Sequence, residues 1–181
     1  PQNMRDYLNE SENRKKLEDR ATVKNEGRVW WRYSRPMHKE FYHLPKIWCS
    51  YRAKENIFCL DESTDFIGLK NTTAIFGNNP NIDLKYILAL LNSKLLNFRY
   101  KSIGKQTGSG VYEYFENQIS KFPIPEIDTK AQKPFIELVD KILKAKKSGG
   151  DTSELEREID VMVYKLYNLT QEEIDIVEGI K

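Results

Sequence analysis

Hydrophobic residues recur at helical spacing in the middle of the chain, over Tyr86–Phe98. Because residues three or four positions apart share one face of a helix, this spacing predicts a single amphipathic helix. Gly104 ends the helical pattern, and a loop rich in glycine, lysine and hydroxylated residues is expected over residues 104–110. Pro123 and Pro125 then predict an extended chain, since both a proline and the residue before it are disfavoured inside a helix.

Upstream of this helix, runs of bulky and β-branched residues predict a set of short strands. The expected strands are Val29–Tyr33, Lys46–Arg52, Asn56–Asp61, Phe66–Leu69 and Thr72–Gly77. At the start of the chain, Met4–Ala21 is rich in charged residues and has few apolar anchors, which predicts a surface helix.

The last third of the chain is helical again, in two apolar-striped segments on either side of Ser148–Asp151. Two helices joined by so short a turn form a hairpin. The expected fold class is therefore α+β, with a mixed β-rich domain followed by a C-terminal helical hairpin. The expected boundaries are an N-terminal surface helix and lead-in at 1–27, the β-rich domain at 28–128 and the helical segment at 129–181.

Charge is unevenly distributed along the 181 residues, although the total is only +2. Residues 1–60 carry a net charge of +5 and residues 85–125 carry +4, whereas the segments 61–84 and 126–181 are acidic. If the two basic segments share a face, that face attracts phosphates. An ordinary solvated surface is the alternative that the small total charge favours.

Two cysteines, Cys49 and Cys59, lie within apolar strand-like segments. Isolated cysteines in a chain rich in lysine and glutamate predict buried thiols in a reducing, cytoplasmic compartment. No apolar run approaches about 18 residues, so no membrane span is expected. The chain begins Pro-Gln-Asn-Met, and we therefore expect it to be a piece of a longer protein.

The segment Lys101–Gly110 combines lysines, glycines and small hydrogen-bonding side chains. Glycines allow backbone N–H groups to approach a phosphate closely, and lysines add positive charge. Gln106, Thr107 and Ser109 can hydrogen-bond base edges. A connection without a binding role fits these residues equally well.

A second candidate segment, Arg28–Arg35, alternates cations with aromatic rings, a pattern that suits nucleic acids. A double tryptophan in a strand more often places one ring in a core, so Arg32 and Arg35 are better candidates for contact than Trp30. Basic character continues on the neighbouring strands at Lys46, Arg52 and Lys54.

Neither a metal site nor a catalytic site is expected. His38, His43, Cys49 and Cys59 offer suitable ligand types, but their spacings match no standard zinc site. The hydrolase, metalloprotease and dinucleotide motifs are absent. Asp61, Glu62 and Asp65 could in principle hold Mg²⁺ for a nuclease, but they are explained more simply as a solvated turn.

The segments Tyr86–Phe98, Tyr112–Phe115 and Ile119–Pro125 together resemble the TaqI-like C-terminal specificity domain. That domain is the target recognition part of type IIG restriction–modification enzymes and related adenine-N6 DNA methyltransferases. The sequence Ile-Ser-Lys-Phe-Pro-Ile-Pro over Ile119–Pro125, with the helices after it, is also similar to the specificity subunits of type I systems.

The resemblance implies a domain that recognises a short sequence in double-stranded DNA and directs a catalytic domain absent from this chain. S-adenosylmethionine and Mg²⁺ are expected only for the parent enzyme, whose upstream methyltransferase or nuclease domains would be partners. No cofactor and no catalytic residue are expected here. The alternatives are a helical module that docks a catalytic subunit or a second copy, and, less favoured, a nuclease.

The family's base-contacting positions vary with the target, so DNA-binding candidates are nominated by their chemistry alone. Phosphate contacts are expected from Arg32, Arg35, Lys46, Arg52, Lys54, Lys101 and Lys105, and base-edge contacts from Gln106, Thr107, Ser109 and Tyr112.

Overall fold

The computed structural model describes residues 3–32, 41, 43–63, 68 and 71–180. The chain forms two compact units, residues 1–42 and 43–181. The division lies between residues 42 and 43, and the C-terminal helices belong to the same unit as the sheets.

The described part of the first unit contains three short helices, α1 (Met4–Asn9), α2 (Ser11–Glu18) and α3 (Ala21–Lys24), in place of the one helix expected. The backbone of Glu10 is extended (ψ 135°) and separates α1 from α2. None of the three helices contains a buried residue. The expected surface character is thus confirmed, while the expected continuity is wrong.

The strand expected over Val29–Tyr33 is also wrong for its described part, where residues 29–32 form no strand. The Arg14 guanidinium lies 5.1 Å from the centroid of the half-buried Trp30 ring, and Trp31 is exposed. The aromatic residues therefore contact cations instead of a partner strand. The strand expected over Phe66–Leu69 lies almost wholly outside the described residues.

The second unit contains two small antiparallel sheets. The first has the strand order β3-β1-β4, with β1 (Lys46–Ser50) between β3 (Phe58–Asp61) and β4 (Thr72–Phe76). The second has the order β2-β6-β5. Its strands are β2 (Arg52–Ala53), β6 (Val111–Glu113) and β5 (Lys105–Gly108).

One residue, Tyr51, separates β1 from β2 and carries the chain from one sheet to the other. Its N–H donates to the Asn71 carbonyl, while its own carbonyl accepts a hydrogen bond from the Tyr114 N–H. The Thr73 hydroxyl also donates to the Tyr114 carbonyl. These bonds fix the second sheet at the end of the first.

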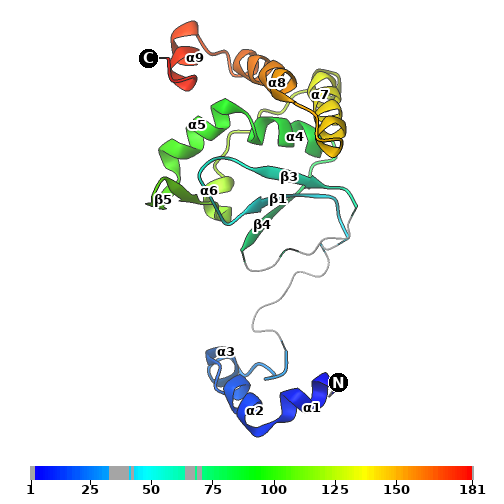
Figure 1. Cartoon of the computed structure of the whole chain (residues 1–181), viewed down its shortest axis with the longest axis vertical. Coiled ribbons are helices and arrows are strands. Elements are labelled where there is room, and N and C mark those ends of the chain that lie inside the picture. Colours follow the sequence, from blue (N-terminus) through cyan, green and yellow to red (C-terminus); the bar gives the residue numbers. More distant parts are fainter. Residues whose placement is uncertain (1–2, 33–40, 42, 64–67, 69–70, 181) are drawn as a thin grey trace. The chain divides into compact units, whose positions relative to one another are not determined.

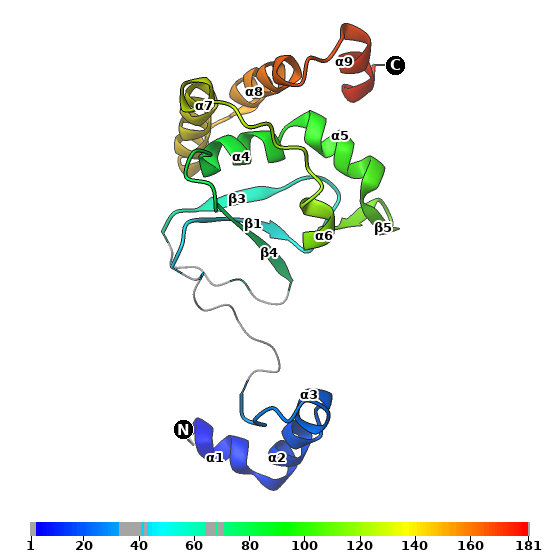
Figure 2. The ribbon, with the colours of Figure 1, turned by 180° about the vertical axis from the view of Figure 1, so that it is seen from behind.

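Six helices complete the described part of this unit, and three of them build its main layer. They are α4 (Leu84–Leu91), α5 (Lys94–Ile103), α6 (Glu116–Ile119), α7 (Thr129–Lys147), α8 (Ser153–Leu166) and α9 (Gln171–Val177). The helices α4, α7 and α8 lie on the same side of the β3-β1-β4 sheet, and α4 contacts β1 and β3 directly (Figures 1 and 2). The fold is α+β, and the expected C-terminal helical hairpin is present as α7 and α8.

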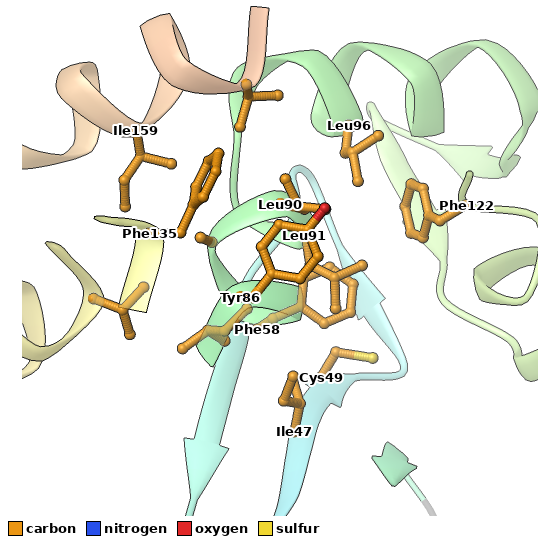
Figure 3. Packing of buried hydrophobic residues seen from close by; sticks show 14 of the residues in the cluster. Ile47, Cys49, Phe58, Tyr86, Leu90, Leu91, Leu96, Phe122, Phe135 and Ile159 are labelled. Carbon is orange, nitrogen blue, oxygen red and sulfur yellow. The ribbon is translucent and has the colours of Figure 1, made fainter. Parts of the chain in front are cut away.

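The core lies between the first sheet and these helices (Figure 3). It is contributed by both sheet and helices, through Ile47, Cys49, Phe58, Tyr86, Leu90, Leu91, Leu96, Phe122, Phe135 and Ile159 among others. Because α7 and α8 supply core residues, the C-terminal segment stabilises the β-rich part and is not a detachable appendage. No helix in the described part of the chain is long and apolar enough to cross a membrane.

The two cysteines have different environments. Cys49 is 4% exposed, and burial raises the pKa of its thiol to about 11, so it stays protonated and inert at neutral pH. Cys59 is exposed, and the expectation that it is buried is wrong. The alternation of side chains along a strand explains the difference, since Cys59 follows the buried Phe58 and faces the opposite side of β3.

The helix expected over Tyr86–Phe98 is interrupted at Asn92 and Ser93, which separate α4 from α5. The Asn92 side-chain amide accepts a hydrogen bond from the Phe58 N–H at 2.9 Å and donates to the Phe58 carbonyl at 3.0 Å. It thus supplies the outer edge of β3 with the pair of bonds that a neighbouring strand would make. Ser93 accepts from the Leu96 N–H and caps α5.

We expect Asn92→Ala to destabilise the domain by about 1–3 kcal/mol, because it leaves the Phe58 N–H and carbonyl without their partner. Urea unfolding followed by circular dichroism would measure the effect, with the exposed Asn117→Ala as the matched control. A change of less than about 0.5 kcal/mol, typical of ordinary surface substitutions, would contradict this role for Asn92.

Candidate nucleic-acid interface

The basic segment 101–113 forms the end of α5 and a β-hairpin, so the expected loop at 104–110 is in large part a strand. Lys105 pairs with Glu113 and Gln106 with Tyr112, and all four residues of β5 are exposed. The register shifts between Gln106 and Gly108, which marks a β-bulge. Gly108, Ser109 and Gly110 all have positive φ angles (113°, 51° and 74°), as a tight turn of this kind requires.

Two tyrosines anchor the hairpin to the core. The rings of Tyr100 on α5 and Tyr114 after β6 stack at 4.3 Å, and the Tyr100 hydroxyl donates to the Glu113 carbonyl. Burial raises the pKa of Tyr100 to about 12, so the hydroxyl keeps its proton and remains a donor at physiological pH. A Cβ at Gly104 would lie 2.8 Å from the Tyr100 carbonyl oxygen, so only glycine lets α5 pass directly into β5.

Three charged residues occupy one rung across the second sheet. Glu113 on β6 pairs in register with Arg52 on β2 and with Lys105 on β5. One Glu113 carboxylate oxygen lies 2.7 Å from Arg52 Nη2, and the other lies 3.1 Å from Lys105 Nζ. Arg52 first and then Lys105 hold the pKa of the buried Glu113 carboxyl below its usual range, so it is charged at neutral pH.

Several sequence candidates therefore come together on this sheet and hairpin. Arg52, Lys54, Lys101, Lys105, Gln106, Thr107 and Ser109 are exposed, on or beside β2, β5 and the end of α5. Tyr112 is half-buried, and its ring contacts Tyr100 edge-on at 6.4 Å between centroids. Tyr112 therefore contributes to the packing of the hairpin as well as to its surface.

Lys46 does not belong to this group, and the prediction that it contacts phosphate is wrong. Its side chain is 1% exposed, and its ammonium lies 3.1 Å from the Asp61 carboxylate. Burial would raise the pKa of Asp61, but hydrogen bonds from Ser63, Lys46 and Trp48 outweigh it and hold the pKa below its usual range. Lys46 and Asp61 are thus a buried structural pair.

The two arginines of the aromatic segment belong to the unit that precedes residue 43. Arg32 lies in the first unit, where its guanidinium is 5.0 Å from the Trp31 ring centroid. Arg35 falls outside the described residues.

Among residues 3–32, 41, 43–63, 68 and 71–180, no three metal-ligating side chains are close enough to hold an ion. His38 and Asp65 are outside this set. Of the acidic turn, Asp61 is paired with Lys46, and Glu62 lies 3.2 Å from Lys85 Nζ.

Sequence reasoning missed Glu113, because within Tyr112–Phe115 it considered only the family resemblance and the chemistry of Tyr112. The available signal was a lone carboxylate between two tyrosines, inside a segment whose other charges are mostly basic. A carboxylate in such a place needs a cationic partner when the strand is buried.

In a comparison with known families, residues 5–124 match the model of the TaqI-like C-terminal specificity domain. The match covers about two thirds of the chain, including both sheets, α4, α5 and the basic hairpin, and it ends before α7. The residues of Tyr86–Pro125 on which the resemblance rested all lie within it, except Pro125. On this match the chain belongs to the family of TaqI-like C-terminal specificity domains.

Proposed function

We propose that this chain recognises a short sequence in double-stranded DNA and directs a catalytic domain that lies elsewhere in the parent enzyme. Its family supports a role in DNA target recognition within restriction–modification enzymes, and a specificity domain is not itself catalytic. The observation that carries the proposal is the anchored β5–β6 hairpin, in which basic side chains flank hydrogen-bonding ones along the exposed strand β5.

The hairpin has one of the two backbone forms that enter the major groove of DNA, the other being an α-helix. A two-stranded β-ribbon fits the major groove, where the pattern of donors and acceptors distinguishes all four base pairs. In this proposal Gln106, Thr107 and Ser109 contact base edges. The exposed cations Arg52, Lys54, Lys101 and Lys105 contact phosphates and fix the orientation of the hairpin.

The chemistry of the parent enzyme follows from the same proposal. A type IIG restriction enzyme or adenine-N6 methyltransferase would bind S-adenosylmethionine in another domain, and a nuclease domain would need Mg²⁺. This chain would supply the sequence preference, and its partners would be double-stranded DNA and those catalytic domains.

Equilibrium binding of the chain to a labelled duplex, measured by fluorescence anisotropy from 50 to 200 mM salt, tests the proposal. We expect binding at low salt that weakens steeply as salt rises, because cations that neutralise phosphates release counterions. Absence of duplex binding at 50 mM salt would contradict the proposal.

A second candidate function, docking of a protein partner by the C-terminal helices, is favoured by a groove of about 1240 Å³ bordered by β3, α4, α5, α7, α8 and α9. Three exposed apolar side chains, Ile57, Val161 and Ile180, line it. Deletion of residues 129–181 would not test this function cleanly, because α7 and α8 belong to the core.

Point substitution tests the docking function without removing core residues. We expect Val161→Glu to abolish assembly with a catalytic subunit or a second copy if the groove is a docking site, because a charge would enter an apolar contact. Sedimentation of mixtures would measure assembly, with Val29→Glu in the first unit as an exposed control. Unchanged assembly in Val161→Glu would reject this function.

A further inference from the structure

Glu113 is a buried carboxylate that lies between two exposed cations. Its carboxylate is 4% exposed, whereas the side chains of its two cationic partners, Arg52 and Lys105, are 58% and 67% exposed. Its backbone is fixed by pairing with a strand on each side and by the hydrogen bond from the Tyr100 hydroxyl. The carboxylate is therefore a fixed point, and the two cations extend from it to the surface.

The two contacts leave most of each cation's hydrogen-bonding capacity unused. A guanidinium has five N–H donors and an ammonium has three, and each cation makes one close contact with Glu113. The Arg52 contact is a hydrogen bond, whereas Lys105 lies within ion-pair distance of an oxygen that accepts no well-aligned hydrogen bond. Arg52 is the more firmly held of the two, and both can still bind an anion from the solvent side.

A buried carboxylate between two exposed cations can have either of two effects on a polyanion. It can neutralise them, in which case removing its charge strengthens binding. Alternatively, it can hold them at a fixed spacing, in which case removing its charge weakens binding although the net charge of the protein rises by one. The two effects have opposite signs, so one substitution separates them.

We propose that Glu113 is a positioning residue, which holds Arg52 and Lys105 so that both can contact the DNA phosphate backbone beside the hairpin. The cross-strand register carries this inference, since it places the three charges on one rung of the β2-β6-β5 sheet. The inference rests on the proposed function, because it assigns the two cations to phosphates. In this proposal Glu113 affects DNA binding only through Arg52 and Lys105.

The test compares duplex binding by the wild-type chain, Glu113→Gln and Glu116→Gln at 0.1 M salt. Glu116→Gln is the matched control, because Glu116 is exposed on the neighbouring α6 and its loss changes the net charge equally. Loss of one phosphate contact at this salt corresponds to about an eightfold loss of affinity by counterion release. We expect about that loss in Glu113→Gln, and equal or slightly tighter binding in Glu116→Gln.

A second measurement in the absence of DNA distinguishes positioning from a purely structural role. The ¹⁵N–¹H heteronuclear NOE of the Arg52 Nε group should be high in the wild-type chain and low in Glu113→Gln, while backbone signals of the core remain unchanged. If Glu113→Gln does not fold, Arg52→Lys serves instead, since it keeps the charge but loses the planar fork. We then expect Arg52→Lys to bind duplex several-fold more weakly.

The outcomes separate this inference from the function on which it rests. A wild-type chain that does not bind duplex would contradict the proposed function, and a rigid Arg52 in Glu113→Gln would independently overturn the positioning role. A wild-type chain that binds while Glu113→Gln binds equally or more tightly would overturn the inference alone. Unchanged affinity in Arg52→Lys would do the same.

Discussion

Replacing Lys46 by alanine is expected to lower the free energy of unfolding by about 3–5 kcal/mol, the usual cost of leaving one member of a buried ion pair without its partner. The Lys46 ammonium also donates a hydrogen bond to the Leu44 carbonyl and lies 5.6 Å from the Trp48 ring centroid. The Asp61 carboxylate would lose its closest cation in a site that remains buried. Chemical unfolding at pH 7 would measure the change.

The matched control is Lys54→Ala, which removes the same charge from an exposed position after β2. Its effect on stability should be within about 0.5 kcal/mol, as for most surface substitutions. If both variants lost the same small amount of unfolding free energy, the Lys46–Asp61 pair would have no structural role. At temperatures where Lys46→Ala is folded, its affinity for duplex DNA should equal that of the wild-type chain.

The largest expected effect on binding comes from Lys101→Ala combined with Lys105→Ala on the hairpin. Two lost phosphate contacts correspond to about a 60-fold loss of affinity at 0.1 M salt, by counterion release. The loss should be similar for every duplex sequence, because phosphate contacts carry no sequence information. Anisotropy titrations with several unrelated duplexes would measure it.

A variant with the same charge change on α7, Lys130→Ala with Lys141→Ala, serves as the control for this pair. Both control lysines are exposed, and neither lies near β5 in the sequence. We expect this control to bind duplex nearly as well as the wild-type chain at 0.1 M salt. Equal losses in the two double variants would show that only net charge matters, and would contradict a binding site at the hairpin.

Much of the fold could be predicted from the hydrophobic pattern. The segments around Trp48, Phe58 and Ala74 are strands, and the C-terminal stripes form α7 and α8, because burial of one face is a local property of the sequence. The break between α4 and α5 could not be predicted in this way. Asn92 interrupts the helix to bind the edge of β3, and that edge lies 34 positions away in the sequence.

The candidate site could be predicted only in part, because it too depends on contacts between segments that are distant in the sequence. Exposed cations and hydrogen-bonding residues around Lys105 follow from composition, but their arrangement depends on pairing between strands. The register that places Lys46 opposite Asp61 in one sheet, and Glu113 between Arg52 and Lys105 in the other, is a tertiary property. Charge alone therefore predicted a DNA contact for Lys46, which is buried, and gave no indication that Glu113 pairs with Arg52 and Lys105.

Selection of bound duplexes from a randomised pool, followed by sequencing, would show whether this chain recognises a DNA sequence through its hairpin. We expect the wild-type chain to enrich one short motif, because hydrogen-bonding side chains on the hairpin contact base edges. We also expect Gln106→Ala to alter the preference at a position of that motif, and Lys101→Ala to lower recovery without altering the motif. A pool without enrichment would contradict recognition by the hairpin. So would selection of the wild-type motif, unchanged at every position, by each of the variants Gln106→Ala, Thr107→Ala and Ser109→Ala.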